Sequence, residues 1–143
     1  MNASSTKTPA KTILVVDDNE IIIKTITLKL QGAGYRVVVA MDGSEAVALV
    51  RTERPDLIVL DIGFPPEVEG VPWDGFRIME WLQRLDPSKK IPVILITGSE
   101  DPKVGERAVA AGVVAFFQKP LEHDRLLKAI RANLGEAAAP GPV

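Results

Sequence analysis

A small set of polar side chains follows short apolar segments of this chain. The set contains three carboxylates, one hydroxyl and one ammonium: Asp17, Asp18, Asp61, Thr97 and Lys119. Oxygen ligands in a chain without cysteine favour a hard cation, and a shallow site that keeps some of its waters suits Mg²⁺. If the fold brings these residues together, the sequence predicts a magnesium site beside a second positive charge.

The electrostatics of such a cluster indicate what it would bind. Two carboxylates about 5 Å apart repel each other by roughly 3 kcal/mol at an effective dielectric constant near 20, so a cation is needed among them. A metal ion, the Lys119 ammonium and the Thr97 hydroxyl would together match the oxygens of a phosphoryl group. Asp61 follows the most apolar segment and is the expected nucleophile, which would form an aspartyl phosphate, while Asp17 and Asp18 hold the metal.

The apolar segments that precede these residues have the character of strands buried on both faces of a sheet. Five of them occur, at Ile13–Val16, Val37–Ala40, Leu57–Leu60, Val93–Ile96 and Val113–Phe117. Each is followed by a stretch with helical periodicity, and this alternation predicts a doubly wound α/β domain with a parallel sheet. Ligands of such folds bind at the carboxyl ends of the strands, which is where the polar set is expected to lie.

Several helix boundaries are also indicated by residue type. Ser44 is the expected N-cap of the second helix, and Asp101 that of the fourth, with Pro102 in its first turn. Gly112 follows the end of the fourth helix. Gly105 inside that helix should weaken it by about 1 kcal/mol relative to alanine, which is compatible with a conformational switch or with a tolerated glycine.

Length and composition limit the class of protein. The chain has 143 residues, of which 46% are hydrophobic and 25% charged, as expected for one globular domain. Its net charge of −2 argues against a direct nucleic-acid binder, and no apolar run is long enough to cross a membrane. We expect a cytoplasmic protein with a disordered arm (1–11), a folded domain (12–134) and a flexible tail or linker start (135–143).

Four motifs in order, each at a strand end, resemble the receiver domain of bacterial two-component response regulators. They are ILVVDDN, DLIVLDIGFP, VILITG and FFQKP. The resemblance covers about residues 12–134 and implies a flavodoxin-like (βα)5 fold with five parallel strands in the order 2-1-3-4-5, an order that the family is known for. It also implies a phosphorylation-controlled switch of protein–protein interactions in two-component signalling.

The resemblance implies a role for each member of the polar set. Asp61 would be the phosphoacceptor, supplied by a phosphohistidine on a sensor histidine kinase or a phosphotransfer protein. Asp17 and Asp18 would hold Mg²⁺ together with Asp61 and the backbone carbonyl of Gly63. Thr97 would be the switch hydroxyl that moves toward the phosphate.

The resemblance assigns further residues around the phosphate. Lys119 would pair with it, and Pro120 would follow, often across a cis peptide bond in this family. Phe116 occupies the aromatic position that repacks as Thr97 moves; because it is less polar than the tyrosine often found there, it should favour a buried, inward position. Such a domain is not an enzyme in the ordinary sense, although slow self-dephosphorylation is expected.

Partners follow from the same resemblance. The output partner would bind the face formed by the fourth helix, the fifth strand and the fifth helix, with no direct contact to nucleic acid or membrane. Homodimerisation and the identity of the kinase stay open.

Two features depart from the family pattern. The loop after Asp61 is long and contains the extra segment PEVEGVPW, which is either a tolerated surface insertion or a cover over the acceptor that changes partner choice or phosphate lifetime. Gly63 replaces the larger side chain that the family tends to have. A more open entrance to the acceptor is expected, with faster attack by water or by small phosphodonors.

Other functional classes compete with this interpretation. A phosphatase or phosphotransferase of the haloacid-dehalogenase type also uses an aspartate nucleophile, but it needs a second carboxylate two residues later, where this chain has Gly63. A flavodoxin-like cofactor binder shares the fold, but Asp17 and Asp18 would repel its phosphate. A degenerate receiver that serves only as a scaffold is disfavoured by the complete polar set.

Overall fold

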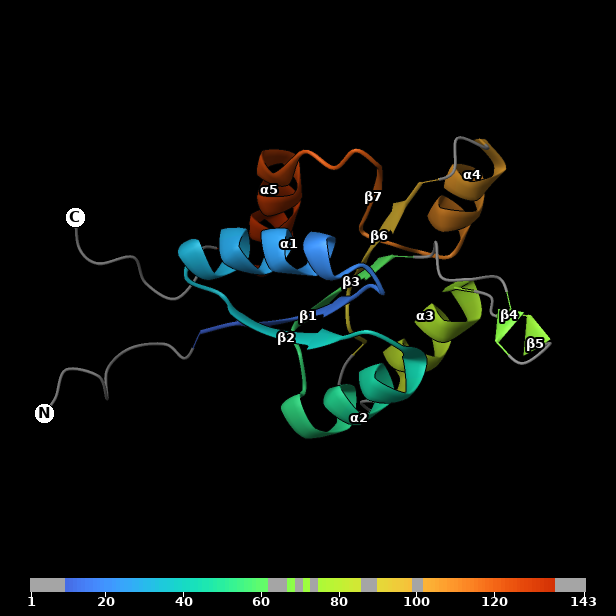
Figure 1. Cartoon of the computed structure of the whole chain (residues 1–143). Helices are drawn as coiled ribbons and strands as arrows, with labels where there is room; N and C mark the ends of the chain where they lie inside the picture. The colour runs from blue at the N-terminus through green and yellow to red at the C-terminus, as the bar shows by residue number, and fades with distance from the viewer. Residues whose placement is uncertain are drawn as a thin grey trace, which may run out of the picture.

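The computed structural model describes residues 10–61, 67–68, 71–72, 75–85, 90–98 and 102–135. A five-stranded parallel sheet runs through the centre and is covered by helices on both faces (Figure 1). The strands lie in the order β2-β1-β3-β6-β7, which is 2-1-3-4-5 when only the strands of this sheet are counted. The predicted doubly wound α/β fold is therefore confirmed.

The strands of the main sheet coincide closely with the predicted apolar segments. They are β1 (Thr12–Val16), β2 (Arg36–Ala40), β3 (Leu57–Asp61), β6 (Val93–Thr97) and β7 (Ala115–Gln118). The three inner strands β1, β3 and β6 are buried along their whole length, whereas the edge strands are only partly buried. This burial explains why the inner segments are apolar on both faces.

One predicted strand begins too early. The apolar run starts at Val113, but β7 begins at Ala115, because the amide of Val113 still bonds to the carbonyl of Ala108 at the end of the preceding helix. Val114 is 41% exposed. The first two residues of this run therefore belong to the connection between helix and strand.

Five helices divide between the two faces of the sheet. They are α1 (Glu20–Gly32), α2 (Gly43–Glu53), α3 (Gly75–Arg84), α4 (Pro102–Ala110) and α5 (His123–Leu134). One hydrophobic core joins α1 and α5 to the sheet, and a second joins α2, α3 and α4 to the opposite face. Figure 1 shows α1 beside α5 on one side of the sheet and α2 beside α3 on the other.

The N-cap of α2 differs from the prediction. The side chain of Asp42 accepts a hydrogen bond from the amide of Glu45 at 2.8 Å, and the Glu45 carboxylate in turn accepts from the amide of Met41 at 2.9 Å. The two hydrogen bonds resemble a capping box displaced by one residue, because Glu45 reaches the amide before the N-cap, and they satisfy two amides at the helix start. Ser44 lies inside the first turn and is not the cap.

The other boundary predictions have mixed outcomes. Pro102 is the first residue of α4, as predicted, whereas Asp101 lies outside the described residues. Gly112 has φ +83° and Gly135 has φ +77°, and both follow helices in the left-handed region that glycine adopts without strain.

The long segment after Asp61 contains a short element that the sequence did not predict. Strands β4 (Glu67–Val68) and β5 (Val71–Pro72) form a two-stranded antiparallel ladder outside the main sheet. The rest of the PEVEGVPW segment lies outside the described residues. Within the described part of the chain, no helix is long and apolar enough to span a membrane.

Candidate functional site

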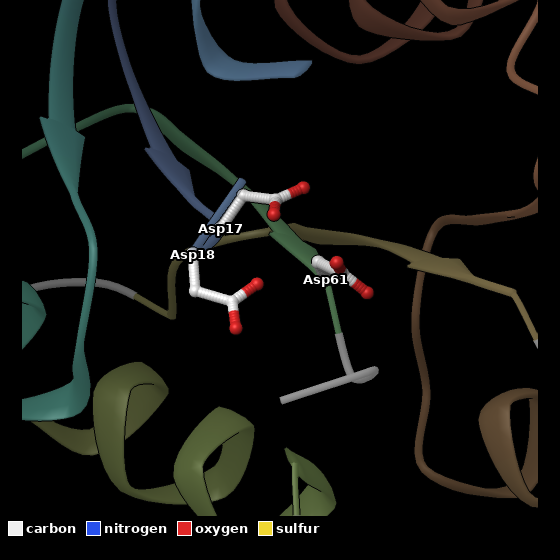
Figure 2. Close-up of side chains that lie close together, drawn as sticks. All are labelled: Asp17, Asp18 and Asp61. Atoms are coloured by element: carbon white, nitrogen blue, oxygen red, sulfur yellow. The ribbon is translucent and has the colours of Figure 1, made fainter. Parts of the chain in front are cut away.

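Three aspartates meet at the carboxyl ends of two neighbouring strands. Val16 pairs with Leu60 in the β1–β3 ladder. Asp17 and Asp61 come directly after these two residues, so they lie beside each other at the same edge of the sheet. One carboxylate oxygen from each of Asp17, Asp18 and Asp61 can be chosen so that the three atoms lie within 4.8 Å of one another. Figure 2 shows the three side chains at the ends of these strands. The predicted convergence of the acidic residues is therefore present in the structure.

Within Asp17–Asp18–Asn19, the helix cap and the acidic cluster use different residues. The side chain of Asn19 caps α1 by accepting from the amides of Ile21 at 2.9 Å and Ile22 at 3.2 Å. The two preceding aspartates are therefore not needed as caps and are left for the acidic cluster. Sequence reasoning did not single out Asn19, although an asparagine before a helical pattern is a recognisable N-cap signal.

Asp17 is the most constrained of the three carboxylates, with an exposed fraction of 1%. Its Oδ1 atom accepts from the amide of Asn19 at 2.8 Å, whereas its Oδ2 atom is buried without a hydrogen-bond partner. A buried carboxylate oxygen without a donor is costly unless a cation approaches it. This oxygen and the exposed carboxylate of Asp18 suit the oxygen ligands that a hard divalent cation prefers.

The environment of Asp17 also changes its protonation. Burial is the largest cause and raises the pKa from 3.8 to about 6, with a further contribution from the nearby charge of Asp61. The amide of Asn19 and the ammonium of Lys119 act in the opposite direction, by stabilising the carboxylate. Metal binding at this position is therefore expected to compete with a proton.

Lys119 supplies the positive charge of the site. Its Nζ atom donates to Asp61 Oδ2 at 2.7 Å and lies 3.9 Å from Asp17 Oδ2. Burial opposes the charged form of Lys119, but the hydrogen bond and charge of Asp61, helped by Asp17, raise its pKa above 10.5. The ammonium therefore offsets part of the repulsion between the two buried carboxylates.

The backbone after β7 fixes the position of this lysine. The amide of Lys119 donates to the carbonyl of Thr97 at 2.8 Å, which ties the end of β7 to the end of β6. The Lys119–Pro120 peptide bond is cis, as the resemblance implied. A Cβ atom placed on Gly98 would lie 4.0 Å from Cδ of Lys119, so this glycine borders the lysine side chain.

Thr97 lies at the same edge of the sheet. It is the last residue of β6 and is 3% exposed, and its predecessor Ile96 pairs with Asp61 in the β3–β6 ladder. Phe116 pairs with Leu95 and is partly buried against the core that includes α4. Gly63 lies outside the described residues. The structure thus joins Asp17, Asp18, Asp61 and Lys119 directly and brings Thr97 to the adjoining strand end.

An apolar groove borders the site between α1 and the start of α5. It encloses about 290 Å³, and its lining includes Ile21, Ile22, Lys119, Pro120 and Leu121. Ile21 is 77% exposed, although it is a large aliphatic residue. Lys119 lines the groove and also donates to Asp61, so this lysine borders both the groove and the acidic site.

Comparison with known sequences and structures gives one consistent result. The sequence model of the response regulator receiver domain matches residues 13–131. A relative named polar-differentiation response regulator DivK, from Brucella anthropi, is 34% identical over 127 residues, which cover 89% of this chain and 98% of DivK. The chemotaxis protein CheY4 of Vibrio cholerae has a similar structure, with a TM-score of 0.75 and 29% identity over 88% of this chain and all of CheY4.

A third similar structure is a response regulator protein from Burkholderia pseudomallei. It was crystallised with a phosphorylated aspartic acid, a calcium ion and citrate. Its TM-score to this chain is 0.72, with 27% identity over 86% of this chain and 68% of that chain. The fold found here therefore supports a phosphorylated aspartate in at least one similar protein.

Proposed function

We propose that Asp61 is the phosphoacceptor of this chain, which belongs to the family of response regulator receiver domains. Domains of this family are phosphoacceptor switches in two-component signalling rather than ordinary enzymes, and they interact with histidine kinases or phosphotransfer proteins and with output partners. The observation that carries the proposal is the 2.7 Å contact of Lys119 with the buried Asp61, inside a cluster of three aspartates. This contact places a cation beside the nucleophile, where it can pair with the phosphoryl group after transfer.

The transfer step can be assigned to atoms of this chain. A carboxylate oxygen of Asp61 attacks phosphorus while the bond from phosphorus to the donor imidazole nitrogen breaks, and the leaving imidazole takes a proton from solvent. Lys119 Nζ, now 2.7 Å from Asp61 Oδ2, then pairs with a phosphoryl oxygen. Preorganised positive charge at the position where negative charge develops is the main catalytic contribution of such a site.

Magnesium ions are bound by receiver domains in general, and the acidic cluster fits this ion. Asp17, Asp18 and Asp61 would hold it, together with the backbone carbonyl of Gly63. The bound ion would neutralise phosphoryl oxygens and align the donor. The buried Oδ2 of Asp17 supports this assignment, because it accepts no hydrogen bond and the Lys119 ammonium stays 3.9 Å away from it.

Movements of Thr97 and Phe116 would couple phosphorylation of Asp61 to a change at the protein surface. The Thr97 hydroxyl would move toward the phosphate, and Phe116, on the neighbouring strand, would repack with it. The resulting change would reach the face formed by α4, β7 and α5, where an output partner binds. Slow attack of water on the aspartyl phosphate would return the switch to its resting state.

The groove beside α1 supports a docking position for the donor. Its lining includes Lys119 and the exposed side chain of Ile21, so a helix that presents phosphohistidine would lie along it with the phosphoryl group at Asp61. Ile21→Ser should leave labelling by acetyl phosphate unchanged. The same variant should slow transfer from a phosphorylated histidine-phosphotransfer protein that labels the wild type; equal transfer rates would exclude this docking position.

Labelling with a small phosphodonor tests the phosphoacceptor itself. The protein is incubated with acetyl phosphate and Mg²⁺, and intact-mass spectrometry follows the adduct. We expect a single phosphoryl adduct that disappears in EDTA and in Asp61→Asn, while the exposed control Asp124→Asn retains it. An adduct that persists in Asp61→Asn would contradict the proposal, and turnover of an added phosphoester would favour the haloacid-dehalogenase alternative.

A further inference from the structure

The ring of Phe116 lies directly against the backbone of α4 at Gly105. A Cβ atom placed on Gly105 would lie 3.4 Å from Cε2 and 3.9 Å from Cδ2 of Phe116. Among the described residues, no other side chain comes this close to that position. The helix therefore presents bare backbone where the aromatic ring packs.

The alternation of β7 explains why the ring reaches α4. Ala115 and Phe117 pack against the core under α1 and α5, whereas Phe116 points to the opposite face and joins the other core. Val104 and Ala108 of α4 belong to that same core and flank Gly105 along the helix. The ring thus occupies a slot between β7 and α4, which we define by Val104, Gly105 and Ala108.

The ring is only partly buried in this slot. Part of the residue is therefore accessible to solvent, while its ring lies against Gly105. Glycine costs helix stability at this position, because alanine is better by about 1 kcal/mol in a helix interior. Close packing of an aromatic ring on the backbone is a physical reason to keep glycine there.

We infer that Gly105 is a positioning residue for Phe116: the missing side chain at 105 lets the ring rest inward on α4, and a larger side chain displaces the ring toward solvent. The functional consequence rests on the proposed function. Phe116 lies two positions before Gln118, which pairs with Thr97, and the amide of the next residue, Lys119, bonds to the Thr97 carbonyl. Side-chain size at position 105 therefore tunes the labelling of Asp61.

Single variants at positions 105, 106 and 116 and one double variant separate side-chain size from helix propensity. Gly105→Ala and Gly105→Leu both replace glycine by a strong helix former. The alanine Cβ would make ordinary van der Waals contact with the ring, whereas the further atoms of leucine would overlap it. Glu106→Leu adds the same side chain at the adjacent exposed position. The double variant Gly105→Leu/Phe116→Ala removes the ring that leucine would displace.

The first measurement is the position of the ring by NMR. We expect nuclear Overhauser contacts between the Phe116 ring and position 105 in the wild type and in Gly105→Ala, where the new methyl group reports them directly. These contacts should be lost in Gly105→Leu and kept in Glu106→Leu. Absence of the methyl–ring contact in Gly105→Ala overturns the inference, even if Gly105→Leu does not fold.

The second measurement is the initial rate of acetyl phosphate labelling. Gly105→Leu should be at least threefold slower than Gly105→Ala, and Glu106→Leu should match the wild type. The double variant should match Phe116→Ala alone. Equal rates for Gly105→Leu and Gly105→Ala overturn the coupling to Asp61. Lack of labelling in the wild type would instead refute the proposed function, and the NMR contacts would still decide the packing of the ring.

Discussion

Lys119 Nζ donates to Asp61 Oδ2 at 2.7 Å, so the ammonium is already bound to the carboxylate that we propose as phosphoacceptor. The same atom is 3.9 Å from Asp17 Oδ2. One ammonium thus serves two buried carboxylates, and the third, Asp18, is exposed to solvent. This leaves an excess of negative charge, which is unfavourable for the folded chain without a cation and favourable for binding one.

The first prediction concerns the cost of ionising Asp17. Because the folded state raises the pKa of Asp17 from 3.8 to about 6, the folded protein binds the proton more tightly than the unfolded chain does. Tighter proton binding at Asp17 contributes about 3 kcal/mol to the free energy of unfolding below pH 4, and this contribution is lost as the pH rises to about 6. Asp17→Asn keeps an oxygen acceptor for Asn19 but removes the charge, so it should raise the free energy of unfolding in EDTA at pH 7.5 by about 1–3 kcal/mol.

Urea denaturation in EDTA between pH 4 and 8 measures this effect. The difference between the wild type and Asp17→Asn should grow as the pH rises from 4 to 6 and then stay constant. Asp124→Asn is the control of opposite sign, because the hydrogen bond from Lys29 lowers the pKa of Asp124. A pH-independent difference between the wild type and Asp17→Asn would show that burial of this carboxylate carries no ionisation cost.

The second prediction is a proton competition in metal binding. An Asp17 with a pKa of about 6 is mostly ionised at pH 7.5 and mostly protonated at pH 5. Metal ligands must be deprotonated, so the affinity for Mg²⁺ should fall about tenfold between these two pH values. Isothermal titration of the wild type with MgCl₂ at both pH values tests this. Asp17→Asn should bind weakly at both, and an equal affinity of the wild type at pH 5 and 7.5 would exclude Asp17 as a ligand.

Much of the fold and site was predictable because the information is local. Each inner strand is an apolar run that ends in a polar residue, and a parallel sheet gathers these ends at one edge without further specification. Asp17, Asp61 and Thr97 therefore met as expected. The contact of Lys119 with Asp61 was predicted only as a contact with phosphate, since the sequence does not reveal which partner the ammonium takes before phosphorylation.

Other features depend on contacts that no local pattern encodes. Ser44 and Asp42 are both acceptable N-caps, and the first turn of α2 selects Asp42, whose side chain accepts from the amide of Glu45. The packing of Phe116 on Gly105 joins β7 to α4 and requires knowledge of which side of the strand faces that helix. These choices are made by tertiary geometry rather than by residue type.

The third prediction concerns a contact across 100 residues of sequence. The hydroxyl of the buried Tyr35 donates to the carbonyl of Gly135 at 3.1 Å, at the point where α5 ends. Tyr35→Phe keeps the ring and removes this hydrogen bond, which should lower the free energy of unfolding by about 1 kcal/mol. Hydrogen exchange should become faster in the last turn of α5 and stay unchanged in β1. Acetyl phosphate labelling should not change, because the contact is at the end of the sheet opposite the acidic site; slower labelling would show that the two ends are coupled.

The fourth prediction separates the two tasks of Lys119. Lys119→Met keeps much of the side-chain volume but removes the charge that both pairs with Asp61 and, in our proposal, stabilises the phosphoryl group. Affinity for Mg²⁺ should rise severalfold, because a competing cation has been removed from the carboxylates, while the initial rate of acetyl phosphate labelling should fall by about 10–100-fold. Titration calorimetry and intact-mass kinetics measure the two quantities on the same sample. Lys128→Met, an exposed lysine on α5, should change neither. Parallel loss of metal affinity and labelling in Lys119→Met would indicate that Lys119 only maintains the shape of the site. Opposite changes would identify Lys119 as a phosphate ligand that is bound to Asp61 until the phosphoryl group arrives.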